Sequence, residues 1–132
     1  MIVDDSSIII KTLSKHLKNF GFNIVGVAKN GQEAMSMYAE LEPDLVTMDI
    51  TMPIMNGIEA LQAIRAYDQS AKVIMITSHG EERLVMDAIS FGAKGYILKP
   101  ITPIKIKQAL QKVCPQLTDI IESHYIEQSL IY

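Results

Sequence analysis

Five short apolar runs recur along the chain, separated by longer segments in which apolar residues return every three or four positions. The runs are Met1–Val3, Ile24–Ala28, Leu45–Met48, Val73–Ile76 and Tyr96–Leu98. Each run is almost continuously apolar, which is typical of parallel strands that helices cover on both faces. The pattern therefore predicts five buried parallel strands.

The segments that follow these runs have helical periodicity, strong in three of them and weaker in Gln32–Leu41 and Ile58–Tyr67. The strong stripes are Ile10, Leu13, Leu17 and Phe20 after the candidate N-caps Ser6 and Ser7; Leu84, Val85, Ala88 and Ile89 before Gly92; and Ile106, Ala109, Leu110 and Val113. A strand–helix alternation repeated five times predicts an α/β fold with a doubly wound sheet.

The end of the chain does not belong to this alternation. Residues 116–132 carry Leu117, Ile120, Ile121, Tyr125 and Ile126 at near-helical spacing, which is too apolar for a disordered tail. We therefore divide the chain into a domain over 1–114 and a C-terminal extension over 115–132. The extension is expected to form a helix that docks on the domain or on a partner.

Composition narrows the classes of function. The 12 Lys and Arg residues are scattered and the net charge is −3, which argues against a nucleic-acid surface because phosphate binding needs a basic patch. No apolar run approaches the length of a membrane span, and no basic segment precedes an apolar one at the N-terminus. The single cysteine, Cys114, cannot form an internal disulfide. We expect a cytoplasmic protein without a membrane anchor.

Polar residues follow four of the five runs. Asp4 and Asp5 follow the first run, Asp49 the third, Thr77 the fourth and Lys99 the fifth. Each alone has an ordinary explanation, such as a solvated turn, a loop cap or an exposed lysine. In an open parallel sheet, however, all these positions share one edge, where such folds bind their ligands. Three carboxylates, a hydroxyl and an ammonium group are therefore expected to converge there.

Three converging carboxylates need protons or a cation. Two carboxylates about 5 Å apart at an effective dielectric constant of about 20 repel by roughly 3 kcal/mol. Their pKa values must rise, or a cation must bind between them. Oxygen ligands with one or two carboxylates suit Mg2+, and an aspartate can itself accept a phosphoryl group. The pattern indicates a site for phosphoryl transfer.

The same positions carry a family resemblance. The segments Val3-Asp4-Asp5-Ser6, Met48-Asp49-Ile50-Thr51-Met52-Pro53, Met55-Asn56-Gly57, Ile76-Thr77-Ser78 and Tyr96-Ile97-Leu98-Lys99-Pro100 resemble the motifs of response-regulator receiver domains in two-component systems. The chain is most similar to the stand-alone chemotaxis type, CheY, over residues 1–114. The resemblance implies five strands in the order 2-1-3-4-5.

The resemblance also implies a role for each site residue. Asp49 would be the phosphoacceptor, phosphorylated by a histidine kinase. Asp5 and Asp49 would ligate Mg2+ through their side chains and Thr51 through its backbone carbonyl, while Asp4 would hold a metal-bound water. Lys99 would pair with the phosphoryl oxygens. The domain would catalyse its own phosphorylation and slow dephosphorylation, without being a turnover enzyme.

Further residues would transmit the signal. The hydroxyl of Thr77 would move to the phosphoryl group, and Tyr96 would then change rotamer and remodel the face made by the fourth helix, fifth strand and fifth helix. A cis Lys99–Pro100 bond is implied as well. Gly57 is expected where the loop needs a permissive backbone. Thr51 and His79 would flank the path of the hydrolytic water.

One departure concerns the first strand. Only three residues precede Asp4, fewer than receivers usually carry. We expect either that the strand is short, with some loss of pairing in the centre of the sheet, or that residues precede Met1.

The implied partners are a histidine kinase as phosphodonor and an output protein, for which a flagellar motor switch protein is the leading expectation. No direct nucleic-acid or membrane binding is expected, and the chain should be a monomer or weak dimer.

The alternative to a stand-alone chemotaxis protein is the receiver of a DNA-binding response regulator, with the extension as the start of a linker. A dehalogenase-type phosphatase is disfavoured because Thr51 stands where its second acid is needed. A flavodoxin-like carrier is disfavoured because Asp4 and Asp5 would repel its phosphate. A phosphate-independent scaffold of the same fold is disfavoured because every implied site residue is present.

Overall fold

A computed structural model describes the backbone of residues 1–131 and the side chains of residues 1–124. At its centre lies a sheet of five parallel strands in the order β2-β1-β3-β4-β5. The strands are β1 (Ile2–Val3), β2 (Val27–Ala28), β3 (Val46–Asp49), β4 (Val73–Thr77) and β5 (Gly95–Leu98). The expected doubly wound sheet and its strand order are confirmed.

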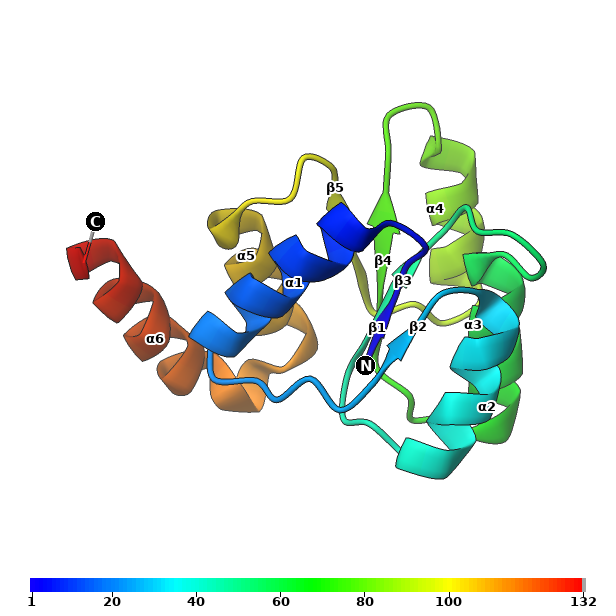
Figure 1. Cartoon of the computed structure of the whole chain (residues 1–132), viewed down its shortest axis with the longest axis horizontal. Helices are drawn as coiled ribbons and strands as arrows, with labels where there is room; N and C mark the ends of the chain where they lie inside the picture. Colours follow the sequence, from blue (N-terminus) through cyan, green and yellow to red (C-terminus); the bar gives the residue numbers. More distant parts are fainter. Residues whose placement is uncertain (132) are drawn as a thin grey trace.

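Helices cover both faces of the sheet (Figure 1). On one face lie α1 (Ser7–Asn19) and α5 (Pro103–Val113), and on the other lie α2 (Gly31–Leu41), α3 (Gly57–Tyr67) and α4 (Glu82–Ser90). After α5 the chain forms a short 3-10 helix, η1 (Pro115–Leu117), and a last helix, α6 (Thr118–Ile131). Within the described residues, no helix is both long enough and apolar enough to cross a bilayer.

The sheet separates two hydrophobic cores, and successive strand residues alternate between them because side chains of a strand point to opposite faces. Towards α2, α3 and α4 point Val3, Val46, Met48, Val73 and Met75. Towards α1 and α5 point Ile2, Ile74, Ile76 and Ile97. Burial on both faces explains why the runs are continuously apolar. Cys114 is a buried member of the second core, and burial raises the pKa of its thiol.

The second strand is shorter than predicted. The apolar run Ile24–Ala28 suggested five residues, but only Val27 and Ala28 form β2. The two residues of β1 pair with Val27 and Ala28, and of the preceding residues only Gly26 is bonded to β1, through its carbonyl oxygen, which accepts from the N–H of Ile2. Strand β1 is short, with two residues, and the carbonyl oxygen of Met1 before it still accepts from the N–H of Thr47. The amino group of Met1 donates to the carbonyl oxygen of Leu45, at 2.8 Å.

Local capping explains where three helices begin. The side chain of Ser6 accepts from the backbone N–H of Ile9 at the start of α1, as predicted. Asn56 and Glu59 form a capping box at the start of α3. Thr102 caps α5, which opens with Pro103. By contrast, α4 has no side-chain cap, although Glu81 occupies its N-cap position.

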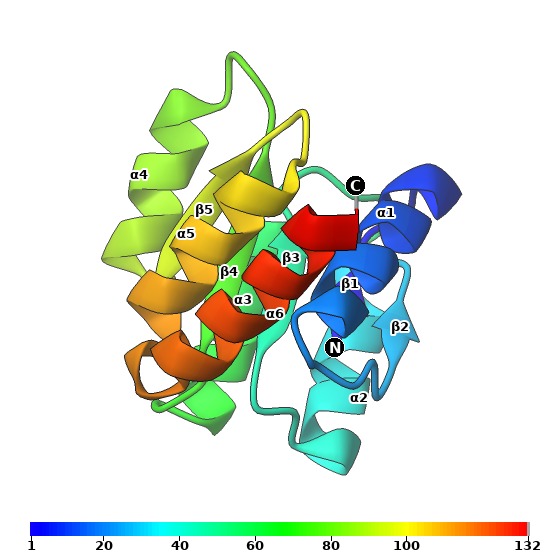
Figure 2. The same cartoon turned by 90° about the vertical axis from the view of Figure 1, so that its left-hand side faces the viewer.

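The C-terminal helix docks on the domain. Figure 2 shows α6 lying along α5 and α1. Ile121 is fully buried in the second core, and Glu122 forms an ion pair with Lys107 (3.1 Å) and accepts a hydrogen bond from Gln111 (2.9 Å). The side chains of Tyr125 and Ile126, which also belong to the predicted apolar stripe, lie outside the described residues.

This packing predicts different effects for two neighbouring substitutions. Ile121→Ala is expected to lower the free energy of unfolding by about 3 kcal/mol, because it leaves a cavity in the second core. Ile120→Ala should change it by less than about 1 kcal/mol, because that side chain is exposed. Urea unfolding followed by circular dichroism measures both. Equal effects would contradict the docking of α6 through Ile121.

Candidate functional site

Three aspartates meet at the carboxyl edge of the sheet. Asp4 and Asp5 follow β1, and Asp49 is the last residue of the adjacent strand β3. The register pairs Val3 with Met48, so the two strands end side by side. One carboxylate oxygen from each aspartate lies within 4.8 Å of the others. Asp4 and Asp49 are buried, whereas Asp5 is exposed, so the cluster has one side open to solvent.

The environment disfavours negative charge on the two buried acids. Burial raises the pKa of Asp49 to about 6, and the charge of Asp4 adds to the effect while Lys99 opposes it. The charges of Asp5 and Glu81 contribute in the same direction as that of Asp4. Burial also raises the pKa of Asp4, against the hydrogen bond from the backbone N–H of Ser6. A positive charge at this position would stabilise both carboxylates.

A lysine faces the cluster from the neighbouring loop. The Nζ atom of Lys99 lies 3.6 Å from Oδ1 of Asp49. The Lys99–Pro100 peptide is cis, in line with what the resemblance implies. Lys105, on α5, donates to the carbonyl oxygens of Leu98 (3.0 Å) and Pro100 (3.1 Å) and so fastens the chain on both sides of Lys99. The sequence carries no signal that would have revealed this role of Lys105.

Gly57 brings α3 against the end of β3. Its N–H donates to the carbonyl oxygen of Ile50 at 2.7 Å. A Cβ atom at this position would lie 2.0 Å from the backbone oxygen of Asp49. We expected glycine at position 57 because of its backbone freedom. This reason is wrong, because Gly57 is not among the residues with a positive φ angle. The glycine is needed for space. The left-handed residue of this loop is Ile54, with φ 69°.

Thr77 ends β4 beside the cluster, but its hydroxyl is directed towards Glu81. Its Oγ1 lies 3.3 Å from Oε1 of Glu81, and the backbone N–H of Ser78 donates to the same oxygen at 2.6 Å. The hydroxyl of Thr51 donates to Oε2 of Glu81 at 2.7 Å. The sequence does not mark Glu81 as a site residue, because a glutamate before a helix is common at exposed N-termini.

The remaining predicted residue lies away from the aspartates. The side chain of Tyr96, in the edge strand β5, is about half exposed (53%). His79, which the resemblance places beside the path of the hydrolytic water, is exposed in the β4–α4 loop. The structure thus gathers Asp4, Asp5, Asp49 and Lys99, and it leaves Tyr96 on the outer surface.

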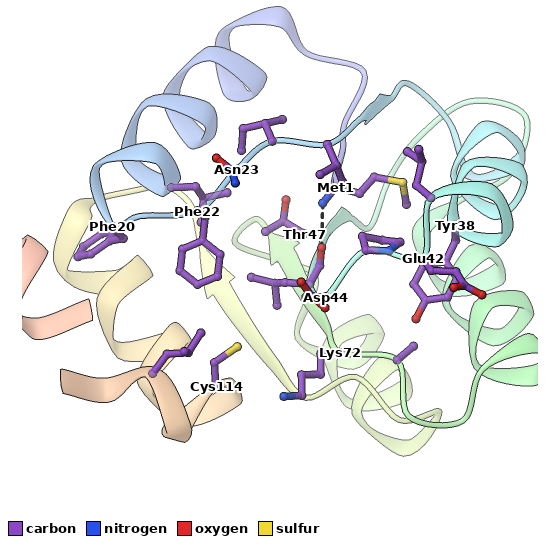
Figure 3. Close-up of a pocket in the computed structure, with 18 of the residues that line it drawn as sticks. Met1, Phe20, Phe22, Asn23, Tyr38, Glu42, Asp44, Thr47, Lys72 and Cys114 are labelled. Carbon is purple, nitrogen blue, oxygen red and sulfur yellow. Dashed lines mark hydrogen bonds between the residues drawn. The ribbon is translucent and has the colours of Figure 1, made fainter. Parts of the chain in front are cut away.

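A large pocket lies elsewhere on the described part of the chain. It has a volume of about 1150 Å3 and is lined by residues such as Met1, Phe22, Asp44 and Cys114, near the amino ends of the strands (Figure 3). None of the aspartates of the cluster lines it, nor does Lys99. The acidic cluster lies at the opposite edge of the sheet, outside this pocket.

The donor set fits a divalent cation. Oδ2 of Asp4 is buried and has no hydrogen-bond partner in the described part of the chain, which is costly unless a ligand satisfies it. The carboxylates around it are hard oxygen donors, the ligands that Mg2+ prefers. Among the described side chains, these aspartates are the group placed to hold a metal ion.

Comparison with known proteins agrees with this geometry. A family model described as the response regulator receiver domain matches residues 1–111. The chain belongs to this family. Chemotaxis protein CheY of Thermotoga maritima is 44% identical to it over 113 residues, which cover 86% of this chain and 94% of the relative.

Two solved structures share the fold of this receiver domain. A CheX–CheY–BeF3–Mg2+ complex from Borrelia burgdorferi is 44% identical, with a TM-score of 0.81 and 85% of each chain covered. A LuxR-family two-component response regulator from Aurantimonas sp. SI85-9A1 is 30% identical, with a TM-score of 0.81, and the match covers 98% of this chain and 96% of that one.

The raised pKa of Asp49 predicts a pH-dependent effect of Asp49→Asn in EDTA. Because the folded pKa of about 6 lies above the ordinary 3.8, folding favours the protonated acid, and this contribution is lost as the pH rises through about 6. The free energy of unfolding of the variant minus that of the wild type should therefore increase between about pH 4 and pH 7. Urea unfolding across this range measures it. A constant difference would contradict the raised pKa.

Proposed function

We propose that this receiver domain is a phosphoryl-accepting switch, in which Asp49 takes a phosphoryl group from a histidine kinase in the presence of Mg2+. The observation that carries the proposal is the position of Asp49, buried at the end of β3 with Lys99 at 3.6 Å and two other acids beside it. A carboxylate oxygen of Asp49 forms the bond to phosphorus. The phosphorus–nitrogen bond of the donor histidine breaks, and its nitrogen keeps the electron pair and takes up a proton.

The chain's own residues prepare this step. Asp5 and Asp49 would hold Mg2+ through their side chains and Thr51 through its carbonyl, while Asp4 would bind a coordinated water. The ion, when bound, offsets the negative charge of the acids and of the incoming phosphoryl group. Lys99 adds positive charge on the side of β5. The same groups would support slow hydrolysis of the aspartyl phosphate, without turnover of an external substrate.

The switch would act on a surface beside the site. We assign Thr77 as the hydroxyl that engages the phosphoryl group and Tyr96 as the side chain that responds by a change of rotamer. The surface of α4, β5 and α5 exposes large apolar side chains that an output partner could cover: Leu84, Met86, Ile89, Phe91, Tyr96 and Ile104. Phosphorylation can favour the active arrangement only by binding it more tightly than the resting one.

The relatives favour chemotaxis as the setting, since the CheY of Thermotoga maritima matches over nearly its whole length. We propose a cytoplasmic protein, monomeric or weakly dimeric, that binds neither nucleic acid nor membrane and whose output partner is a flagellar motor switch protein. In this view residues 1–114 are the receiver and residues 115–132 an extension. A receiver of a DNA-binding regulator is the second candidate, because the LuxR-family structure matches 98% of the chain, α6 included.

The deciding experiment is incubation of the wild-type chain with acetyl phosphate and Mg2+, followed by intact-mass measurement and peptide mapping. The expected result is a gain of one phosphoryl group on Asp49 that EDTA prevents. A chain whose mass does not change with Mg2+ present, or one modified at another residue, would rule out the proposed function.

A further inference from the structure

One carboxylate beside the site is not used in the chemistry above. Glu81 is only partly exposed, and both of its oxygens accept hydrogen bonds. These bonds come from Thr77 and Ser78 at the end of β4 and from Thr51 in the loop after β3. Glu81 therefore ties the two loops together at the mouth of the site.

We propose that Glu81 is an internal competitor of the phosphoryl group: in the resting domain its carboxylate occupies hydrogen-bond donors that a phosphoryl group on Asp49 would otherwise bind. Glu81 is thus a positioning residue that favours the resting state. The inference rests on the proposed phosphorylation of Asp49 and adds a regulatory element to the same site.

The position of the donors supports this role. Strands β3 and β4 are neighbours, and their register pairs Asp49 with Ile76, the residue just before Thr77. The hydroxyl of Thr77 and the N–H of Ser78 are thus attached to the backbone next to the phosphoacceptor. Both lie within hydrogen-bond distance of Oε1 of Glu81, at 3.3 Å and 2.6 Å, and the hydroxyl of Thr77 also lies 3.4 Å from the carbonyl oxygen of Ser78. They must leave Glu81 before they can bind another anion.

The third bond closes the bridge. Oε2 of Glu81 accepts from the hydroxyl of Thr51, which lies two residues after Asp49 in the chain. The negative charge of Glu81 acts on Asp49 itself, since it helps to raise the pKa of that acid. A phosphoryl group brings up to about two negative charges to this place, so it repels Glu81 while it competes for the same donors.

Displacement of Glu81 would reach α4. Glu81 occupies the N-cap position of that helix, and its backbone oxygen accepts from the N–H of Val85. Its side chain does not cap α4, because it is held by the loops instead. Release of the carboxylate therefore removes the side-chain bonds between Glu81, at the junction of the β4–α4 loop and α4, and the two loops, and leaves the backbone bonds of Glu81 to Ser78 and Val85 in place. This gives a physical link between the anion at Asp49 and the surface proposed for output.

The adjacent residue supplies a matched control. Glu82 carries the same charge one position later, is exposed, and accepts from the N–H of Gly80 at 3.3 Å. It has no bond to Thr51, Thr77 or Ser78 among the hydrogen bonds of the described side chains. Glu82→Gln removes a charge close to α4 without opening the bridge.

The experiment measures binding of beryllofluoride, a stable anionic substitute for the phosphoryl group, in the presence of Mg2+. The wild type, Glu81→Gln, Glu81→Ala and Glu82→Gln are titrated in parallel, with binding followed by the amide resonances of Thr77 and Ser78, because the chain has no tryptophan to report it. We expect Glu81→Ala to bind about fivefold more tightly than the wild type. Glu81→Gln should lie between them, because glutamine keeps neutral hydrogen bonds. Glu82→Gln should stay within about twofold of the wild type.

Two further measurements distinguish competition from a purely structural role. In the free protein, Glu81→Ala should shift the Ser78 amide proton upfield, because its short hydrogen bond is lost. The same variant should melt at a lower temperature than the wild type while it binds the anion more tightly. If Glu81 merely held the loops in shape, its replacement by alanine would lower both the melting temperature and the affinity for the anion.

The outcomes separate this inference from the proposed function. If the wild type binds beryllofluoride and is phosphorylated, but Glu81→Ala binds equally or more weakly, the competitor role is wrong and phosphorylation of Asp49 stands. An equal gain in affinity in Glu82→Gln would also overturn the competitor role, because the effect would then come from removal of any nearby negative charge. A wild-type protein that is neither phosphorylated nor able to bind the anion would contradict both the competitor role of Glu81 and the proposed function.

Discussion

Asp49→Asn is expected to lose all detectable covalent phosphorylation by acetyl phosphate, and yet to melt at a higher temperature than the wild type in EDTA at neutral pH. The amide has no oxygen nucleophile of comparable strength, so no aspartyl phosphate can form. Stability should rise because burial and the charge of Asp4 disfavour the ionised Asp49, as its raised pKa shows. Intact-mass measurement tests the loss of phosphorylation, and a thermal melt tests the gain in stability.

The matched control is Asp44→Asn. Asp44 is an exposed aspartate that lines the pocket at the amino edge of the sheet, far along β3 from the phosphoacceptor. This variant should be phosphorylated to the same extent as the wild type. A phosphorylated Asp49→Asn protein would mean that another side chain accepts the group. A melting temperature lowered in Asp49→Asn would mean that the carboxylate is stabilising in the absence of metal.

Gly57→Ala is expected to lower the free energy of unfolding by about 3 kcal/mol or more, one of the largest effects available to a single methyl group. The added Cβ would lie 2.0 Å from the backbone oxygen of Asp49 and 3.0 Å from the Cα of Ile50. Both neighbours are main-chain atoms at the end of β3, so neither can move aside as a side chain could. The substitution should also displace Asp49 and reduce phosphorylation.

Gly80→Ala serves as the comparison. A Cβ at Gly80 would meet no atom within 4 Å, but its φ of +92° is unfavourable for alanine. This variant should lose about 1–2 kcal/mol, the cost of a left-handed residue, and keep its phosphorylation. Urea unfolding and intact mass are measured on both proteins. Equal stability losses in the two variants would show that the contact with β3 is not what requires glycine at position 57.

The proposed phosphorylation would be coupled to stability at this edge of the sheet. Asp4 and Asp49 have raised pKa values, first because they are buried and second because they lie close to other acids. In metal-free protein they oppose folding near neutral pH, and a bound cation would remove much of that cost. The site is therefore expected to be more stable with Mg2+ than without it.

The sequence by itself determined the sheet and the edge at which the site lies. Short, continuously apolar runs are typical of strands covered on both faces, and parallel strands place all their carboxyl ends on one side. The positions of Asp4, Asp5, Asp49, Thr77 and Lys99 after four runs were enough to bring them together. The helix in the last residues also followed from apolar spacing alone.

Only the tertiary structure decided the features that depend on contacts between distant segments. Strand β2 is limited to the two residues that pair with β1, although its own apolar run is longer. The need for glycine at position 57 comes from the close approach of α3 to β3. The bridge made by Glu81 and the support of Lys99 by Lys105 join residues of different loops and helices. Local patterns carry no information about such contacts, because each is created only when the strands and helices pack.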